Sequence, residues 1–537
     1  YLPENVAAAA FAWGSALLAC LLLRRLRSAH FPGTPSWVMG LGLTVVTFGN
    51  LLPLLLRRPV FYELAIASAC FFALLAALWL HRALGRPERA TRYLAGASLA
   101  LGLAVAARPD YLFGTAALWG VYLWWIRPSG RPPWAADRRR FLAALLAIVI
   151  PLGAIGLAMA VYNDLRFGSW TEFGTHYMLA GSNQEQLQMT GLKFAPLNFY
   201  YYFLAPPQIS AYFPFFQVIA FPPLQAPAGF QGEEDVYGAL FSVPVIWGLL
   251  CLRGALHRRT PAASDQLKLF SAATLACAGM VAAFLLTLCG ATNRYLVDFL
   301  TPALPLAVAG IMAWEARPPG GLRLLGRIAW VAALGYTLLF NFFSSLEHNG
   351  LFRHFQPGKY RQLAHAFNHL SLWDGETSAS RVGPLEIRLI FPADRTGHIE
   401  PLIVTGLSFQ ADFLWVFYTD ANHLQLGFEH TSYGGPKTDP IEIDYSVAHT
   451  LRVEMGSFYP PVDHPYFDGV APEAVARLKR TLRVSLDGRE VLAATCDFYD
   501  SSPGDVTVGH NPVSDAFGRR FGGRILGTRR GSAPAAP

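Results

Sequence analysis

Long apolar runs fill the first two thirds of the chain. They cover residues 6–23, 37–56, 61–81, 93–107, 110–126, 141–161, 236–254, 267–289, 295–314 and 325–344. A helix needs roughly 20 apolar residues to cross a bilayer, and a chain with only 15% charged residues and 53% hydrophobic residues is unusual for a soluble protein. The pattern predicts an α-helical multi-pass membrane bundle of about ten spans.

Beyond residue 345 the pattern changes, and apolar and polar positions alternate. The alternation is clear over residues 385–391, 413–418, 423–428, 449–455 and 481–486, and Asp487-Gly488 is a typical hairpin turn. Short alternating strands without long helices predict an all-β sandwich. We therefore divide the chain into a membrane domain (1–345) with a large outer loop (162–235), a linker (346–380), a β-sandwich domain (381–528) and a disordered tail (529–537).

Arginine residues crowd every second connector between the apolar runs. They are Arg24, Arg25 and Arg27; Arg82, Arg86, Arg89 and Arg92; Arg127, Arg131, Arg138, Arg139 and Arg140; Arg253, Arg258 and Arg259; and Arg317, Arg323 and Arg327. Short basic loops stay in the cytoplasm. We therefore expect a protein of the bacterial inner membrane whose C-terminal domain is periplasmic. Most of the net charge of +7 lies in these short loops, so we expect it to contact anionic lipid headgroups and not nucleic acid.

The opposite ends of the spans carry carboxylates together with arginines. These residues are Arg57, Arg58 and Glu63; Arg108 and Asp110; Asn163, Asp164 and Arg166; Glu233, Glu234 and Asp235; and Arg294 and Asp298. Ionisable groups at membrane depth are expensive and often functional. Arginine can hold a phosphate leaving group while a carboxylate takes a proton from an attacking hydroxyl. Arginine can also simply reach lipid headgroups, and Arg294 with Asp298 has the spacing of a structural salt bridge on one helical face.

The outer loop is rich in aromatic residues and proline. It suits short helices in the headgroup layer, either as a plain aromatic anchor or as a surface that guides a lipid-linked or sugar substrate. Candidate substrate-contacting residues at its start are Tyr162, Asn163, Arg166, His176 and Tyr177. The six cysteines form no cluster with metal-ligand spacing, so the sequence assigns no metal-binding residues.

Four short motifs resemble the multi-pass glycosyltransferases of the C-type fold, which are related to protein mannosyltransferases and lipid A aminoarabinose transferases. The motifs are Arg58-Pro-Val-Phe-Tyr-Glu63, Ala107-Arg-Pro-Asp-Tyr111, Asn163 with Arg166-Phe-Gly168, and Asn293-Arg-Tyr-Leu-Val-Asp298. The resemblance covers residues 1–345. It implies transfer of a sugar from a polyprenyl phosphate, with Glu63 and Asp110 as acidic catalytic residues and Arg58, Arg108 and Arg294 as phosphate-binding residues.

In that family the catalytic carboxylate usually lies in the first outer loop. The chain begins with Tyr1 on the outer side, so we expect an earlier span and part of this loop to precede it. The C-terminal segments Leu482-Arg-Val-Ser-Leu-Asp-Gly488 and Asp505-Val-Thr-Val-Gly-His-Asn511 resemble laminin-G or concanavalin-like domains, which implies a jelly-roll sandwich that binds glycans or proteins.

The resulting hypothesis is a membrane glycosyltransferase. It moves a sugar from a polyprenyl-phosphate donor to an extracytoplasmic glycan, lipid or protein acceptor, with or without a divalent metal ion. Two alternatives stay open at this point: a non-catalytic membrane receptor for glycans, and a transporter of lipid-linked intermediates.

Overall fold

The computed structural model divides into two compact units, which are described separately. The first combines Tyr1–Pro206 with Leu224–Leu346, and the second combines Pro207–Pro223 with Glu347–Pro537. The structure describes residues 3–127, 137–174, 177, 188–218, 222–257, 261–346, 351–368, 382–462 and 464–531. His176 and part of the predicted linker and tail lie outside these ranges.

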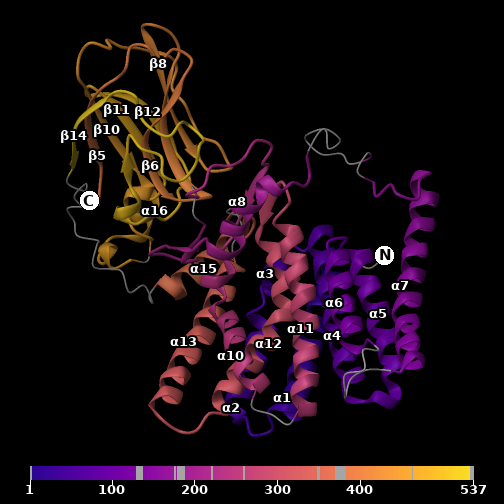
Figure 1. The fold of residues 1–537 in the computed structure, drawn as a ribbon. Coiled ribbons are helices and arrows are strands. Elements are labelled where there is room, and N and C mark those ends of the chain that lie inside the picture. The colour runs from indigo at the N-terminus through magenta and orange to yellow at the C-terminus, as the bar shows by residue number, and fades with distance from the viewer. Residues whose placement is uncertain are drawn as a thin grey trace. The chain divides into compact units, whose positions relative to one another are not determined.

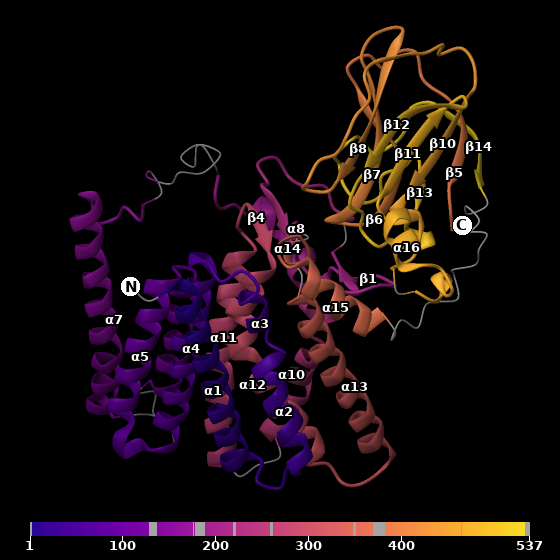
Figure 2. The ribbon, with the colours of Figure 1, turned by 180° about the vertical axis from the view of Figure 1, so that it is seen from behind.

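The first unit is a bundle of helices (Figures 1 and 2). Its helices are α1 (Glu4–His30), α2 (Ser36–Phe48), α3 (Leu52–Leu55), α4 (Phe61–Gly85), α5 (Ala90–Ala107), α6 (Tyr111–Ile126), α7 (Arg138–Phe167), α8 (Ala195–Phe199), α9 (Ala239–Ser242), α10 (Leu249–His257), α11 (Pro261–Leu285), α12 (Leu296–Glu315) and α13 (Gly321–Ser344). In both views the connectors α1–α2, α4–α5 and α12–α13 lie at the lower ends of their helices.

Several of these helices are suited to a membrane. In the described part of the chain, eight helical segments are long and apolar enough to cross one, and two shorter apolar helices accompany them at Tyr111–Ile126 and Pro244–Gly254. This result confirms the predicted class of a helical, apolar, multi-span region. The number of ten spans stays a prediction.

Helix α12 is the most enclosed of the long helices. Its membrane-length window, in the segment Asn293–Glu315, is 94% buried, whereas the windows of α7 and α13 are each 17% buried. Close packing explains part of this burial, because a Cβ atom placed on Gly310 would lie 1.9 Å from the carbonyl oxygen of Gly248. Small residues permit such approaches between helix backbones.

A short parallel ladder ties the long loop after α7 to the start of α12. Strand β3 (Gly232–Glu234) pairs with β4 (Gly290–Thr292), and the 3₁₀ helix η7 (Asn293–Tyr295) follows β4 directly. The ladder therefore fixes Glu234 beside Thr292, immediately before Asn293 and Arg294. The sequence gives no strand signal here.

The second unit contains two five-stranded antiparallel sheets. Its elements are β1 (Gln208–Ile209), β2 (Phe216–Gln217), α14 (Leu351–Phe355), α15 (Pro357–Asn368), β5 (Leu385–Ile390), β6 (Ile399–Leu407), β7 (Gln410–Tyr418), β8 (His423–His430), β9 (Ile441–Glu442), β10 (His449–Met455), α16 (Pro472–Leu478), β11 (Thr481–Leu486), β12 (Arg489–Thr495), β13 (Thr507–Val508) and β14 (Arg524–Arg530). The strand orders are β12-β11-β10-β5-β14 and β13-β6-β7-β8-β9. Strand β14 includes Arg529 and Arg530, which the sequence places in the tail.

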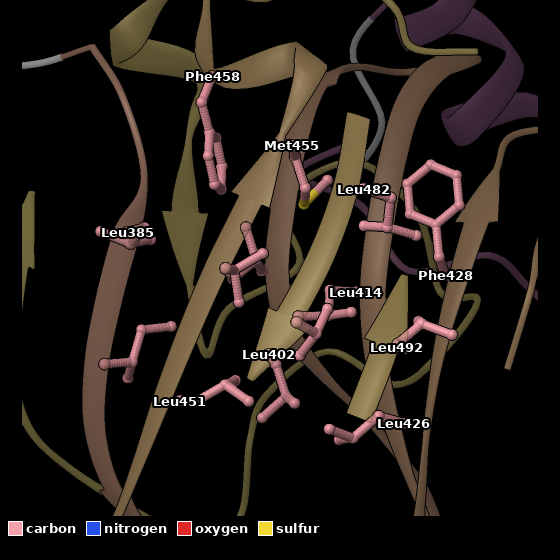
Figure 3. Packing of buried hydrophobic residues seen from close by; sticks show 14 of the residues in the cluster. Leu385, Leu402, Leu414, Leu426, Phe428, Leu451, Met455, Phe458, Leu482 and Leu492 are labelled. Carbon is pink, nitrogen blue, oxygen red and sulfur yellow. The ribbon is translucent and has the colours of Figure 1, made fainter. Parts of the chain in front are cut away.

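The inner faces of both sheets share one hydrophobic core (Figure 3). Every second residue of β10 is buried, which places Leu451, Val453 and Met455 in this core. Leu414 and Leu426, on β7 and β8, belong to the same core from the other sheet. The alternation in the sequence thus predicted the antiparallel sheets correctly, because a strand with one buried face must alternate.

Candidate functional site

Charged side chains from several helix ends meet at one end of the first unit, opposite the arginine-rich connectors. The group comprises Arg57 and Arg58 between α3 and α4, Glu63 in the first turn of α4, Arg108 and Asp110 between α5 and α6, Glu234 and Asp235 around β3, Arg294 in η7, and Asp298 in the first turn of α12. We call these nine residues the charged cluster. Each stands at the end of an element, so short connectors on that side decide which groups meet.

Glu63 lies between two arginines. Its Oε1 is 3.4 Å from Arg58 Nη2 and 3.7 Å from Arg294 Nη1. Both distances exceed the usual length of a charge-assisted hydrogen bond, which is about 2.7–2.9 Å. Both arginines are also paired with Glu234. Arg58 Nη2 lies 3.1 Å from Glu234 Oε1, and Arg294 Nη1 donates a hydrogen bond to Glu234 Oε2. Glu234 is therefore the closer partner of both guanidinium groups.

Glu63 is almost fully buried, with 3% of its surface exposed. Its second oxygen, Oε2, has no hydrogen-bond partner among the described residues, and neither does the side-chain amide of the buried Asn293. A buried polar group without a partner costs about 1–3 kcal/mol. The unpartnered Glu63 oxygen beside two arginines points to a polar occupant of this place, such as a ligand or ordered water.

Arg108 joins two acids from different helices. Its Nη2 lies 3.1 Å from Asp110 Oδ2 and 3.0 Å from Asp298 Oδ2, and its guanidinium lies 4.8 Å from the centre of the Tyr295 ring. The Tyr111 hydroxyl donates to the Asp298 carbonyl at 2.7 Å. One guanidinium nitrogen thus holds the ends of α5, α6 and α12 together.

Arg57 forms the third part of the cluster. It pairs with Asp235 at 2.8 Å and donates to the Ser344 carbonyl at 3.1 Å, so it connects the segment after β3 with the end of α13. Four arginines thus face five carboxylates in the ion pairs of the charged cluster. With all groups ionised the cluster has a net charge of one negative, so a phosphate has to displace a carboxylate in order to reach a guanidinium.

The sequence left open a structural salt bridge between Arg294 and Asp298, and this pair is not formed. Arg294 contacts Glu234 and Glu63, and Asp298 contacts Arg108 instead. The reason is local: Arg294 lies in the 3₁₀ turn before α12, so the four-residue spacing does not place the two side chains on one α-helical face.

The predicted residues at the start of the long loop form a separate group. Arg166 donates to the Tyr162 hydroxyl at 2.7 Å and its guanidinium lies 5.0 Å from the Phe167 ring centre, which in turn stacks on Tyr177. The Asn163 amide donates to the Trp170 carbonyl at 3.4 Å. These contacts are all within the segment 162–177, so the structure does not bring them to the charged cluster. His176 lies outside the described residues.

Sequence reasoning named Glu234 among the span-end carboxylates and Asn293 within a motif, but gave neither residue an individual role. Glu234 was visible as part of an acidic triplet, but its contact with Arg58 and Arg294 depends on the β3–β4 ladder. In the described parts of the chain, no group of three or more His, Cys, Asp or Glu side chains is placed to hold a metal ion.

Comparison with known proteins adds no family. No protein-family model, no curated protein and no solved structure matches the chain.

Proposed function

We propose that the chain is a membrane glycosyltransferase that takes its sugar from a polyprenyl-phosphate donor. The observation that carries the proposal is the buried Glu63 carboxylate, loosely held between Arg58 and Arg294 with one oxygen unpartnered. A proton acceptor and phosphate-binding groups then lie within one site at a single end of the bundle.

In the proposed reaction, the acceptor hydroxyl attacks the anomeric carbon of the donor. A bond forms between the hydroxyl oxygen and that carbon, and the bond between the carbon and the phosphate oxygen breaks. The polyprenyl phosphate leaves with the electron pair, and Glu63 takes the hydroxyl proton. Arg58 and Arg294 stabilise the charge that develops on the phosphate.

Arg108 and Asp110 have a different part in this proposal. Arg108 is paired with Asp110 and Asp298 at 3.0–3.1 Å, and its ion pairs do not include Glu63, the proposed proton acceptor. We assign Arg108, Asp110 and Asp298 to positioning the start of α12, and with it Arg294.

The proposal includes the sidedness of the chain. The arginine-rich connectors are placed in the cytoplasm of a bacterial cell, and the charged cluster and the two-sheet unit on the outer side of the inner membrane. The two-sheet unit is proposed to be a jelly roll of the concanavalin type that holds the extracytoplasmic glycan, lipid or protein acceptor.

The test compares Glu63→Gln with Glu315→Gln. Glu315 is a matched control, because it is also buried and also paired with two arginines, Arg323 and Arg327, but at the other end of α12. The full chain in lipid nanodiscs is incubated with a panel of radiolabelled undecaprenyl-phosphate sugars and with a bacterial cell-envelope extract that supplies acceptor hydroxyls, and the release of undecaprenyl phosphate is measured.

We expect Glu63→Gln to lower turnover about 100-fold or more, the usual scale for loss of a general base, while Glu315→Gln retains most of it. Equal turnover by the Glu63→Gln variant and the unchanged chain would remove Glu63 from the reaction. Binding of a donor without release favours a receptor, and movement of the donor across liposomes favours a transporter.

A further inference from the structure

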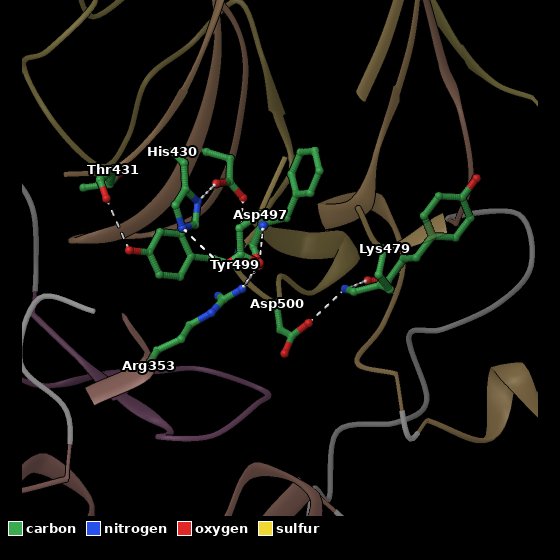
Figure 4. A network of polar contacts seen from close by, with 10 residues as sticks. Arg353, His430, Thr431, Lys479, Asp497, Tyr499 and Asp500 are labelled. Atoms are coloured by element: carbon green, nitrogen blue, oxygen red, sulfur yellow. Dashed lines mark hydrogen bonds and ion pairs between the residues drawn. The ribbon is translucent and has the colours of Figure 1, made fainter. Parts of the chain in front are cut away.

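A small pocket in the second unit lies beside the C-terminal end of strand β8. Figure 4 shows the polar contacts of four residues that line it: Arg353, His430, Asp497 and Tyr499. It has a volume of about 160 Å³, and its walls are Arg353 and His354 of α14, His430 at the end of β8, Tyr433, Asp497 and Tyr499. Pockets for drug-sized ligands measure roughly 300–1,000 Å³. This pocket therefore suits one small group.

Four of the lining side chains form a continuous stack of rings. His354 stacks on Tyr433 at 4.4 Å between ring centres, Tyr433 on His430 at 5.5 Å, and His430 on Tyr499 at 4.2 Å. Tyr433 is 39% exposed, so part of its ring is accessible. Planar rings held in this way offer apolar surface of fixed orientation.

The polar groups of the pocket are also held in place. The His430 Nδ1 lies 2.6 Å from Asp412 Oδ1, and the other oxygen of this buried carboxylate accepts the backbone N–H of Tyr499 at 2.9 Å. Since a carboxylate accepts hydrogen bonds, Nδ1 carries a proton and the ring orientation of His430 is fixed.

The opposite ring nitrogen of His430 faces the pocket. Its Nε2 lies 4.0 Å from Asp497 Oδ2, which is too long for a hydrogen bond. A hydroxyl oxygen that approaches from the pocket side can lie about 2.8 Å from both atoms, off the line that joins them. Asp497 is 63% exposed, and its other oxygen is held by Arg353 at 2.9 Å.

Arg353 closes the pocket from the side of α14. It donates to Asp497 and to the Phe498 carbonyl, and its guanidinium lies 4.8 Å from the centre of the Tyr499 ring. The positive charge of Arg353 is thus matched by Asp497, and Asp412 adds a second negative charge behind His430. Among the described residues that line the pocket, the one arginine is thus paired with a carboxylate, and this lining does not favour an anion.

We infer that this pocket binds one neutral sugar residue of a glycan. A pyranose or furanose ring presents C–H groups that pack on the part of the Tyr433 ring that stays exposed beside the stack of rings, and adjacent hydroxyls that match the paired planar groups of Asp497 and Arg353. One further hydroxyl approaches His430 Nε2 and Asp497 Oδ2 from the pocket side and bridges them. The size of the pocket limits it to a single residue.

This inference does not rest on the proposed transfer reaction, because a receptor without catalysis would use the same pocket. It also assigns a task to α14, which supplies one wall. Sugar binding is therefore tested without any donor, and its failure would leave the transfer reaction untouched.

The test uses the full chain in nanodiscs and saturation-transfer difference NMR. The probes are the methyl glycosides of glucose, mannose, galactose, N-acetylglucosamine and arabinose. We expect at least one glycoside to bind, with transfer to its ring C–H protons. Tyr433→Ala should abolish the signal, and Asp497→Asn should weaken binding about 10-fold, since hydrogen bonds to charged groups contribute on that scale.

Asp420→Asn is the matched control, because Asp420 is a similarly exposed carboxylate (54%) that also faces a histidine, His423, at 2.9 Å. It should leave binding unchanged, and Tyr433→Phe should retain it. If Tyr433→Ala fails to fold, the exposed and isosteric Asp497→Asn change still tests whether the pocket binds the glycoside. No binding by any glycoside, binding that survives both Tyr433→Ala and Asp497→Asn, or binding of only inorganic phosphate or tetramethylammonium would overturn the inference.

Discussion

Removal of the Arg108 guanidinium is the sharpest test of the charged cluster. Arg108 holds Asp110 and Asp298 at 3.1 and 3.0 Å, and the side chain of Asp298 is fully buried. Arg108→Met keeps the length of the side chain and removes its charge. Two carboxylates from different helices then face each other in a poorly solvated place without a cation between them.

The size of the effect follows from these contacts. Removing one partner of a buried ion pair costs about 3–5 kcal/mol, and the lost contact with the Tyr295 ring adds about 0.5–2 kcal/mol. We expect Arg108→Met to lower the free energy of unfolding by about 4–6 kcal/mol. Adding Asp298→Asn should restore about 2 kcal/mol or more, because one charge is removed and the new amide can donate to Asp110.

The measurement is a double-mutant cycle on the full chain in detergent micelles, with equilibrium unfolding as the readout. Arg323→Met is the control, since Glu315 keeps Arg327 at 2.8 Å after that change. We expect it to cost about 1–2 kcal/mol, the scale of one hydrogen bond to a charged group. A cost below about 1 kcal/mol for Arg108→Met, or no recovery with Asp298→Asn, would show that water solvates these acids and that the argument from burial is wrong.

Two further predictions concern packing and pH. Gly310→Ala should destabilise the first unit by about 1–3 kcal/mol, because its Cβ would lie 1.9 Å from the Gly248 carbonyl oxygen. Gly279→Ala, with nothing within 4 Å of its Cβ, should be neutral or slightly stabilising. Thermal unfolding compares the two variants, and equal unfolding midpoints would contradict the close packing of Gly310 on Gly248. Partial burial alone would raise the pKa of Asp487, but hydrogen bonds from His449 and a backbone N–H outweigh it and hold that pKa below its ordinary value. The stability that this pair contributes is complete above the ordinary pKa of about 3.9 and is lost as the pH falls through the lowered value. Hydrogen-exchange protection of β10 and β11 should therefore depend less on pH, from 4 to 2, in Asp487→Asn than in the unchanged chain. An identical pH dependence in both proteins would exclude the Asp487–His449 pair as the cause of the loss.

The sequence could predict those features that depend on local periodicity and on charge. The strands His449–Met455 and Thr481–Leu486 have the bounds that their alternation indicated, because apolar and polar residues alternate along a strand that is buried on one face. Charges at the ends of apolar runs were likewise visible, and the structure brings Glu63, Arg58 and Arg294 together.

The remaining features depend on contacts between distant segments. The partner of Arg294 could not be predicted, because an unexpected ladder places Glu234 beside it and a 3₁₀ turn removes it from the face of Asp298. The pocket beside β8 could not be predicted either, since His430 and Asp497 are single residues on separate segments without a characteristic spacing. Neither pattern has a period or a motif that could be read locally.

The two ends of α12 limit how the bundle can move. Asp298 at one end is a buried carboxylate that pairs with Arg108. Glu315 at the other end is a buried carboxylate that pairs with Arg323 and Arg327 of α13. Sliding or turning this helix would strip both acids of their counter-ions at once, which a low-dielectric interior penalises heavily. Both ends of α12 are therefore fixed, and we expect a rearrangement that admits the proposed lipid donor to involve a sparsely covered helix such as α7.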